Sequence, residues 1–157
     1  QAIMQAAKKA DDSLLRDYAE TTVAVADIKI AVRSMKTGKN KDFTKRAMAE
    51  CSTLDIDRLA TAAVAGMEEI ERYLADTAYA GGAEALSKSA SAFERWCDNR
   101  IIETIKPQKY NPFTVGPIVA YILARLNEIK TVRIILTCKL NQLPEEAIRE
   151  RVREMYV

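Results

Sequence analysis

Apolar residues recur every three or four positions along most of the chain, which is the spacing of one face of an α-helix. The clearest early example predicts a helix over residues 13 to about 37, with Ser13 as a candidate cap and Gly38 as the stop. Its alternating four-three spacing resembles a coiled-coil seam. Because the pattern stops at Gly38, packing inside a helical bundle explains it better than a long coiled coil. The apolar face comprises Leu14, Tyr18, Thr21, Val25, Ile28, Val32 and Met35.

Shorter helices are expected between residues 40 and 80. Phe43, Ala47 and Met48 would anchor one. Asp55 or Thr53 would cap the next, which points Ile56, Leu59, Ala63 and Val64 inward and ends at Gly66. Residues 68–74 continue as helix, and Ala80-Gly81-Gly82 is expected to form a loop. A second long helix then covers residues 83–106 and ends at Pro107, with an apolar face of Leu86, Ala90, Phe93 and Cys97.

The last third of the chain organises the rest. Gly116 and Pro117 introduce a helix that is apolar on most sides, which predicts burial, with a stripe of Ile118, Ile122, Leu126, Ile129, Val132 and Leu136. Arg125 and Arg133 project into this apolar side. They either pair with carboxylates, Glu128 being within reach of Arg125, or extend their charged ends to water.

A short helix closes the chain after Pro144, with Ala147, Ile148, Val152 and Met155 inward. The pairs Glu145/Arg149 and Glu150/Arg153 are expected on its outer face.

Composition excludes several classes of protein. The 157 residues suffice for one core, and few glycines and prolines favour an all-α fold. No uncharged apolar run is long enough for a membrane span. A net charge of +2 does not argue for nucleic acid. The basic stretch from Lys36 to Arg46 could contact phosphates or lipid headgroups, but a solvated helix face explains it more simply.

The residues offer no catalytic centre. The chain has no histidine, and its three cysteines lack the C-x-x-C spacing of a metal or redox site. Gly38-Lys39 lacks the remaining residues of a P-loop. We therefore predict no catalytic residue, no cofactor, no metal, and neither nucleic acid nor a small-molecule substrate as partner.

The C-terminal stretch resembles the C subunit of archaeal and bacterial V-type (A-type) ATPases, whose eukaryotic equivalent is the d subunit of the vacuolar ATPase. Leu126 departs from the family pattern, which often has an acid there, and Cys138 and Gln142 replace common glycines. The matching pieces, all in the same order, are Pro112-Phe113, Gly116-Pro117, Ala120-Tyr121, Glu128-Ile129-Lys130, Arg133-Ile134-Ile135, Lys139-Leu140-Asn141, residues 146–151 and Tyr156-Val157.

The resemblance implies a non-catalytic central-stalk (rotor) subunit, peripheral on the cytoplasmic face of the membrane, that couples the rotating stalk to the membrane proteolipid ring for ion transport. It implies an all-α bundle of long and short helices within a pseudo-threefold, three-domain funnel. The chain would then be a fragment of a longer subunit. A faint repeat that aligns Asp27-Ile28-Lys29 with Glu128-Ile129-Lys130 suggests about two repeats, at 13–80 and 114–157, joined by the helix 83–106.

Two other functions remain open on the residues alone. One is a generic helical adaptor or scaffold that binds partner helices in an apolar groove. The other is a membrane or nucleic-acid binder that uses the basic stretch. The resemblance also suggests contact residues, because polar residues face the interior of the stalk socket in the family. The polar positions of the long C-terminal helix could line that socket, or they could form internal ion pairs: Arg125, Asn127, Glu128 and Arg133.

Overall fold

The computed structural model describes residues 2–156. Within them it contains helices joined by turns and loops, with no strand, which confirms the predicted all-α fold. The chain forms two compact units, residues 1–87 and 88–157. The first contains α1 (Ala2–Ala10), α2 (Ser13–Lys36), α3 (Lys41–Ala47), α4 (Ile56–Ala65), α5 (Met67–Ala75) and most of α6 (Ala80–Lys88). The second contains α7 (Ala90–Ile105), a 3₁₀ turn η1 (Lys106–Tyr110), α8 (Gly116–Leu140) and α9 (Glu145–Arg151).

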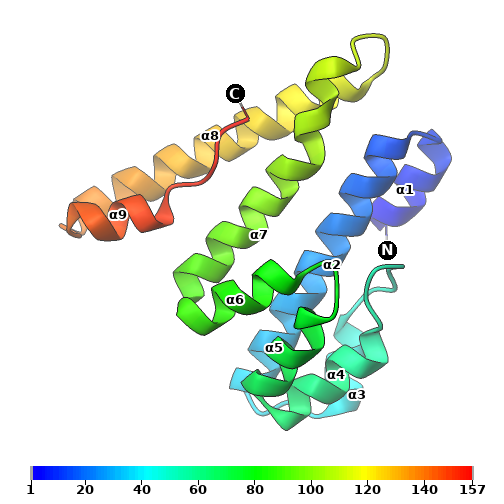
Figure 1. Cartoon of the computed structure of the whole chain (residues 1–157), viewed down its shortest axis with the longest axis vertical. Coiled ribbons are helices and arrows are strands. Elements are labelled where there is room, and N and C mark those ends of the chain that lie inside the picture. Colours follow the sequence, from blue (N-terminus) through cyan, green and yellow to red (C-terminus); the bar gives the residue numbers. More distant parts are fainter. Residues whose placement is uncertain (1, 157) are drawn as a thin grey trace. The chain divides into compact units, whose positions relative to one another are not determined.

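The long helix α2 is the axis of the first unit, and α1, α3, α4 and α5 pack around it (Figure 1). Its N-terminus is capped by Asp12, whose carboxylate accepts the Leu15 N–H at 3.0 Å, rather than by Ser13. Its C-terminus turns at Gly38, where φ is +62° and glycine avoids a steric penalty, as expected. The core against α2 comes from fully buried side chains: Ile28, Leu59, Ala60, Ile70 and Leu74.

The apolar pattern predicted two residues to be buried that the structure shows to be exposed. Phe43 on α3 and Val64 on α4 are 48% and 55% exposed. On α3 Thr44 is the buried residue instead. Its hydroxyl donates to the Asn40 carbonyl at 3.0 Å, so the polar group is hydrogen-bonded although it is buried. The predicted cap at Asp55 and the predicted helix end at Gly66 are confirmed. The Asp55 carboxylate accepts from the Asp57 and Arg58 N–H groups, and Gly66 separates α4 from α5.

The helix expected over residues 83–106 is two helices, and the loop expected at Gly81-Gly82 belongs to the first of them, α6. The break lies at Ser89, whose backbone is extended and whose Oγ accepts the Ala92 N–H at 2.9 Å. The same hydroxyl donates to Glu150 Oε1 at 3.0 Å. A serine that caps α7 and also bonds to α9 therefore outweighs the helical periodicity that runs through it.

Part of the basic stretch is already neutralised within the first unit. Lys41 Nζ and Lys45 Nζ lie 2.8 and 2.9 Å from the two oxygens of Asp57. The hydrogen bonds from these two lysines lower the pKa of Asp57 to about 2. Both ammonium groups thus have a carboxylate partner, which supports a solvated helix face over a phosphate site.

Asp27 is a buried carboxylate on α2 that holds the start of the loop after α3. It is 1% exposed, and Oδ1 accepts the Ala49 N–H at 3.1 Å while Oδ2 has no partner among the described residues. Burial raises the pKa of Asp27 to about 6, and the Ala49 N–H opposes this shift. At neutral pH the folded protein therefore carries an unfavourable buried charge.

The Asp27→Asn variant should reveal this charge in the pH dependence of stability. The pKa of Asp27 in the folded protein lies above the unfolded value of 3.8. The protonated carboxyl therefore stabilises the folded state fully below about pH 4, and this stabilisation is lost as the pH rises through about 6. We expect urea unfolding of the wild type to lose about 2 kcal/mol between pH 4 and 7 from this group, and Asp27→Asn to remove that slope. Asp17→Asn, an exposed change on the same helix, should keep it. An unchanged slope in Asp27→Asn would contradict the assignment.

Candidate interface on the C-terminal helix

The helix α8 packs within its unit through small and polar residues rather than through its large apolar ones. The side it turns to α7 and α9 consists of Gly116, Ala120, Ala124, Asn127, Thr131 and Cys138. Small side chains allow the helix axes to approach closely, so the unit needs no large residue from α8 for this contact. The packed face of α8 is therefore not the face that the apolar stripe indicated.

The predicted apolar stripe of α8 faces outward. Burial was expected for this helix, but Ile118 is 66% exposed and Leu126 58%. The periodicity correctly placed these residues on one face. It could not show which side of α8 the unit covers, because other large apolar residues (Leu123, Ile134 and Ile135) lie off this stripe and the helix is apolar on most sides. The other exposed members are Ile122, Ile129, Val132 and Leu136.

Of the four candidate contact residues, three lie on or beside this outward face. Arg125 pairs with Glu128 one turn away, as the spacing allowed, and its side chain is 57% exposed. Arg133 is exposed and, with Leu126, Ile129, Ile134 and other residues, lines a shallow apolar groove of about 590 Å³. The two arginines thus place positive charge at the edges of an apolar surface, and their role in binding a partner stays a prediction.

Asn127 points the opposite way and is engaged within the chain. It is 9% exposed, and its Nδ2 donates to the Glu154 carbonyl at 2.8 Å. The backbone N–H of Glu154 donates in turn to Asn99 Oδ1 on α7 at 2.9 Å. The carboxylate of Glu154 accepts from Lys106 Nζ at 2.8 Å. One residue of the C-terminal segment is therefore held from α7, η1 and α8.

Asp98 on α7 makes the strongest tie to this segment. Its Oδ2 accepts from Arg153 Nε at 2.8 Å and its Oδ1 from Lys130 Nζ at 2.6 Å. Arg153 was expected on the outer face of the last helix, but it is 7% exposed and inward. The reason is that α9 ends at Arg151, so the following residues are extended and run back beside α8 (Figure 1). Local periodicity carried no signal for Asp98, Asn99 or Arg153, because their pairing depends on this return.

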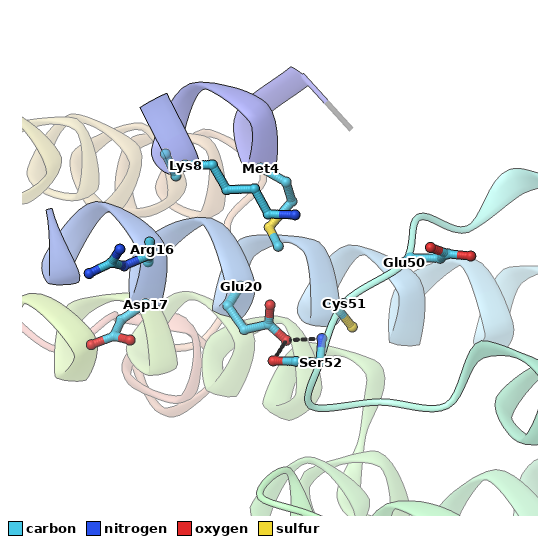
Figure 2. A pocket seen from close by; sticks show the side chains of 9 residues that line it. Met4, Lys8, Arg16, Asp17, Glu20, Glu50, Cys51 and Ser52 are labelled. Carbon is cyan, nitrogen blue, oxygen red and sulfur yellow. Dashed lines mark hydrogen bonds between the residues drawn. The ribbon is translucent and has the colours of Figure 1, made fainter. Parts of the chain in front are cut away.

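A second hollow, of about 460 Å³, lies in the first unit between α1, α2 and the loop after α3 (Figure 2). Glu20 reaches into it from α2, and its Oε1 accepts hydrogen bonds from both the backbone N–H and the hydroxyl of Ser52 and Thr53, at 2.5–3.0 Å. Burial raises the pKa of Glu20, but these hydrogen bonds outweigh it and the net shift is downward. Burial also raises the pKa of the nearby Cys51 thiol.

Neither Glu20 nor Cys51, which both line this hollow, is placed to act as a base or an activated nucleophile. The Glu20 carboxylate is occupied in holding the loop, and a thiol with a raised pKa is poorly nucleophilic at neutral pH. Within residues 2–156 no cluster of acidic, cysteine or histidine side chains has the arrangement of a metal site. The surface of α8 is therefore the better candidate for function, as a protein interface.

Comparison with known proteins gives two matches. A family model described as ATP synthase (C/AC39) subunit matches residues 1–151. The C subunit of the A-type ATP synthase of Methanocaldococcus jannaschii is 28% identical over 152 residues, which cover 88% of this chain and 37% of the relative. The chain thus spans little more than a third of the length of that protein. No solved structure matches. None of the helices in the described residues could cross a membrane.

We predict that the buried ion pair of Asp98 and Arg153 supports the second unit. Asp98→Ala leaves Arg153 buried without its carboxylate and should lower the free energy of unfolding by about 3 kcal/mol. Trp96 on α7 is the sole tryptophan of the chain, so its fluorescence during urea unfolding reports on this unit.

The matched control is Glu145→Ala, which removes an exposed pair with Arg149 on α9 and should change stability by less than about 0.5 kcal/mol. The double variant Asp98→Leu/Arg153→Met replaces both charges with apolar side chains and should recover most of the loss. If Asp98→Ala and Glu145→Ala lowered the free energy of unfolding equally, the pair of Asp98 and Arg153 would contribute no more to stability than an exposed pair, which would contradict the prediction.

Proposed function

The chain belongs to the ATP synthase (C/AC39) subunit family, and we propose that it acts as a non-catalytic central-stalk subunit of a V-type or A-type rotary ATPase. In this function it couples the rotating stalk to the membrane proteolipid ring, from a peripheral position on the cytoplasmic face. The observation that carries the proposal is the family match over residues 1–151, which leaves only the last few residues outside it.

The fold suits a part that transmits force. Its helix α8 has 25 residues, a length of about 38 Å, and its unit fixes that helix along one side through α7, α9 and the C-terminal segment. A helix held in this way resists bending better than a free one. Its uncovered side presents a long apolar surface with arginines at the edges, which is a combination typical of protein interfaces.

The relative's length bears on what this chain does alone. Because the chain covers 37% of the relative, we propose that it is a portion of a longer subunit and holds about two of its repeats, at 13–80 and 114–157. A funnel of three such domains would seat the stalk at one end and rest on the proteolipid ring at the other. This chain would then contribute part of one or both surfaces.

The second candidate function is a helical adaptor that binds a partner helix. The shallow apolar groove on α8 favours it, since an amphipathic helix could lay its apolar face there. The two functions differ in partner: the first requires binding to stalk subunits of a rotary ATPase, and the second does not.

The direct test is calorimetric titration of the chain with purified central-stalk subunits of an A-type ATP synthase, at low and moderate salt. Saturable binding that persists at moderate salt would support the stalk function, because apolar contact is screened far less than surface charge. If neither this chain nor a longer subunit that contains it binds, the proposal is wrong.

We expect Arg133→Leu to weaken stalk binding by about tenfold while the melting temperature stays unchanged, because the arginine is exposed and contributes to the interface rather than to the fold. Arg149→Leu on α9 is the control: it also removes an exposed arginine and should leave binding unaltered. A parallel decrease in both variants would indicate a general effect of positive charge and exclude a specific role for Arg133.

A further inference from the structure

The loop between α3 and α4, residues 48–55, is attached to α2 by two carboxylates at separate places. Near the start of the loop, the Ala49 N–H donates to Asp27 Oδ1 at 3.1 Å. Farther along, Glu20 Oε1 accepts backbone and hydroxyl hydrogen bonds from Ser52 and from the residue after it (Figure 2). All of these residues belong to the first unit.

The two carboxylates differ in how well their charge is solvated. Glu20 lines the hollow between α1, α2 and the loop, and several N–H and hydroxyl donors meet its charge. Asp27 is 1% exposed, and only the Ala49 N–H meets its charge. Its Oδ2 has no partner among the described residues, which enclose this oxygen so that bulk solvent does not reach it. Ionised Asp27 is therefore costly where it lies, whereas ionised Glu20 is not.

The helices that pack around α2 supply no buried counter-charge for Asp27. Within the described residues, the buried side chains of α1, α3, α4 and α5 are all uncharged. On the loop the neighbouring titratable group is Cys51, whose pKa the charges of Glu20 and Asp27 both raise. The N-terminal amino group and the Ala49 N–H lower the pKa of Asp27, but burial outweighs them.

We propose that ionisation of Asp27 releases the start of the loop, residues 49–51, from α2 and so opens the adjoining hollow as the pH rises towards neutral. Release breaks the Ala49 N–H bond and admits water to the carboxylate, which solvates its charge better than one N–H does. Protonated Asp27 has no charge to solvate, so the attached form is favoured at acidic pH. Cys51 lines the hollow, which therefore widens when this part of the loop moves.

The remainder of the loop stays in place because its attachments do not involve Asp27. Glu20 remains ionised near neutral pH, since its pKa is lowered. The hydroxyl of Thr53 is hydrogen-bonded to the Tyr79 hydroxyl at 2.8 Å. The N–H of Asp55 donates to the Tyr73 hydroxyl at 2.7 Å. The release is thus confined to the part of the loop before these contacts.

Hydrogen exchange of the Ala49 amide, followed by NMR and divided by its intrinsic rate at each pH, measures the released fraction. The pKa of Asp27 is about 6 in the folded protein and 3.8 without the shift. The protection of Ala49 should therefore fall about tenfold between pH 5 and 7 and change little above. The amides of Ser52 and Thr53 should keep their protection. Because local release exposes little surface, urea below the unfolding transition should not accelerate the exchange of Ala49.

Three variants separate the two attachments. Asp27→Asn keeps an acceptor for the Ala49 N–H without a charge and should remove the pH dependence of Ala49 protection. Asp17→Asn, an exposed change beside the same hollow, should retain it. Glu20→Gln weakens the other attachment: it should accelerate exchange at Ser52 and leave the tenfold change at Ala49 intact.

Three results would overturn the inference. Protection of Ala49 that is equal at pH 5 and 7 would mean that ionisation does not release the loop. The same tenfold decrease in Asp27→Asn would assign it to another group. Exchange of Ala49 that accelerates in urea together with that of Ile28, in the core of α2, would show global unfolding in place of a local release. Circular dichroism of each variant checks that the helices remain folded.

Discussion

The carboxylate of Asp98 is the point on which the second unit depends. It accepts from Arg153 and from Lys130, so a single side chain of α7 joins the C-terminal segment to α8. A buried arginine is costly unless its charge is met, and Arg153 is 7% exposed. The chain therefore cannot release this segment without leaving a buried charge unpaired, and the segment covers the same side of α8 as α7 and α9 do.

The covered side explains how an apolar helix can leave its largest residues in water. Glu154 of the segment is held by Asn127 of α8 and Asn99 of α7, and small residues of α8 fill the remaining contact. Once that side is closed, the branched residues of the opposite side have no partner in the unit. The polar contacts of Asn127 and Asn99 therefore lie on the covered side of α8, and the apolar stripe on its other side stays exposed within this unit.

The sequence predicted those parts of the structure that local chemistry decides. Gly38, Asp55 and Gly66 mark helix ends because a positive φ or a cap needs only neighbouring residues. The helix break at Ser89 was not predicted. The Ser89 hydroxyl caps α7 and also bonds to the distant Glu150, and the spacing of apolar residues carries no information on either contact. The candidate interface was found in part: spacing placed Arg125 beside Glu128, but only the folded chain shows Asn127 and Arg153 turned inward.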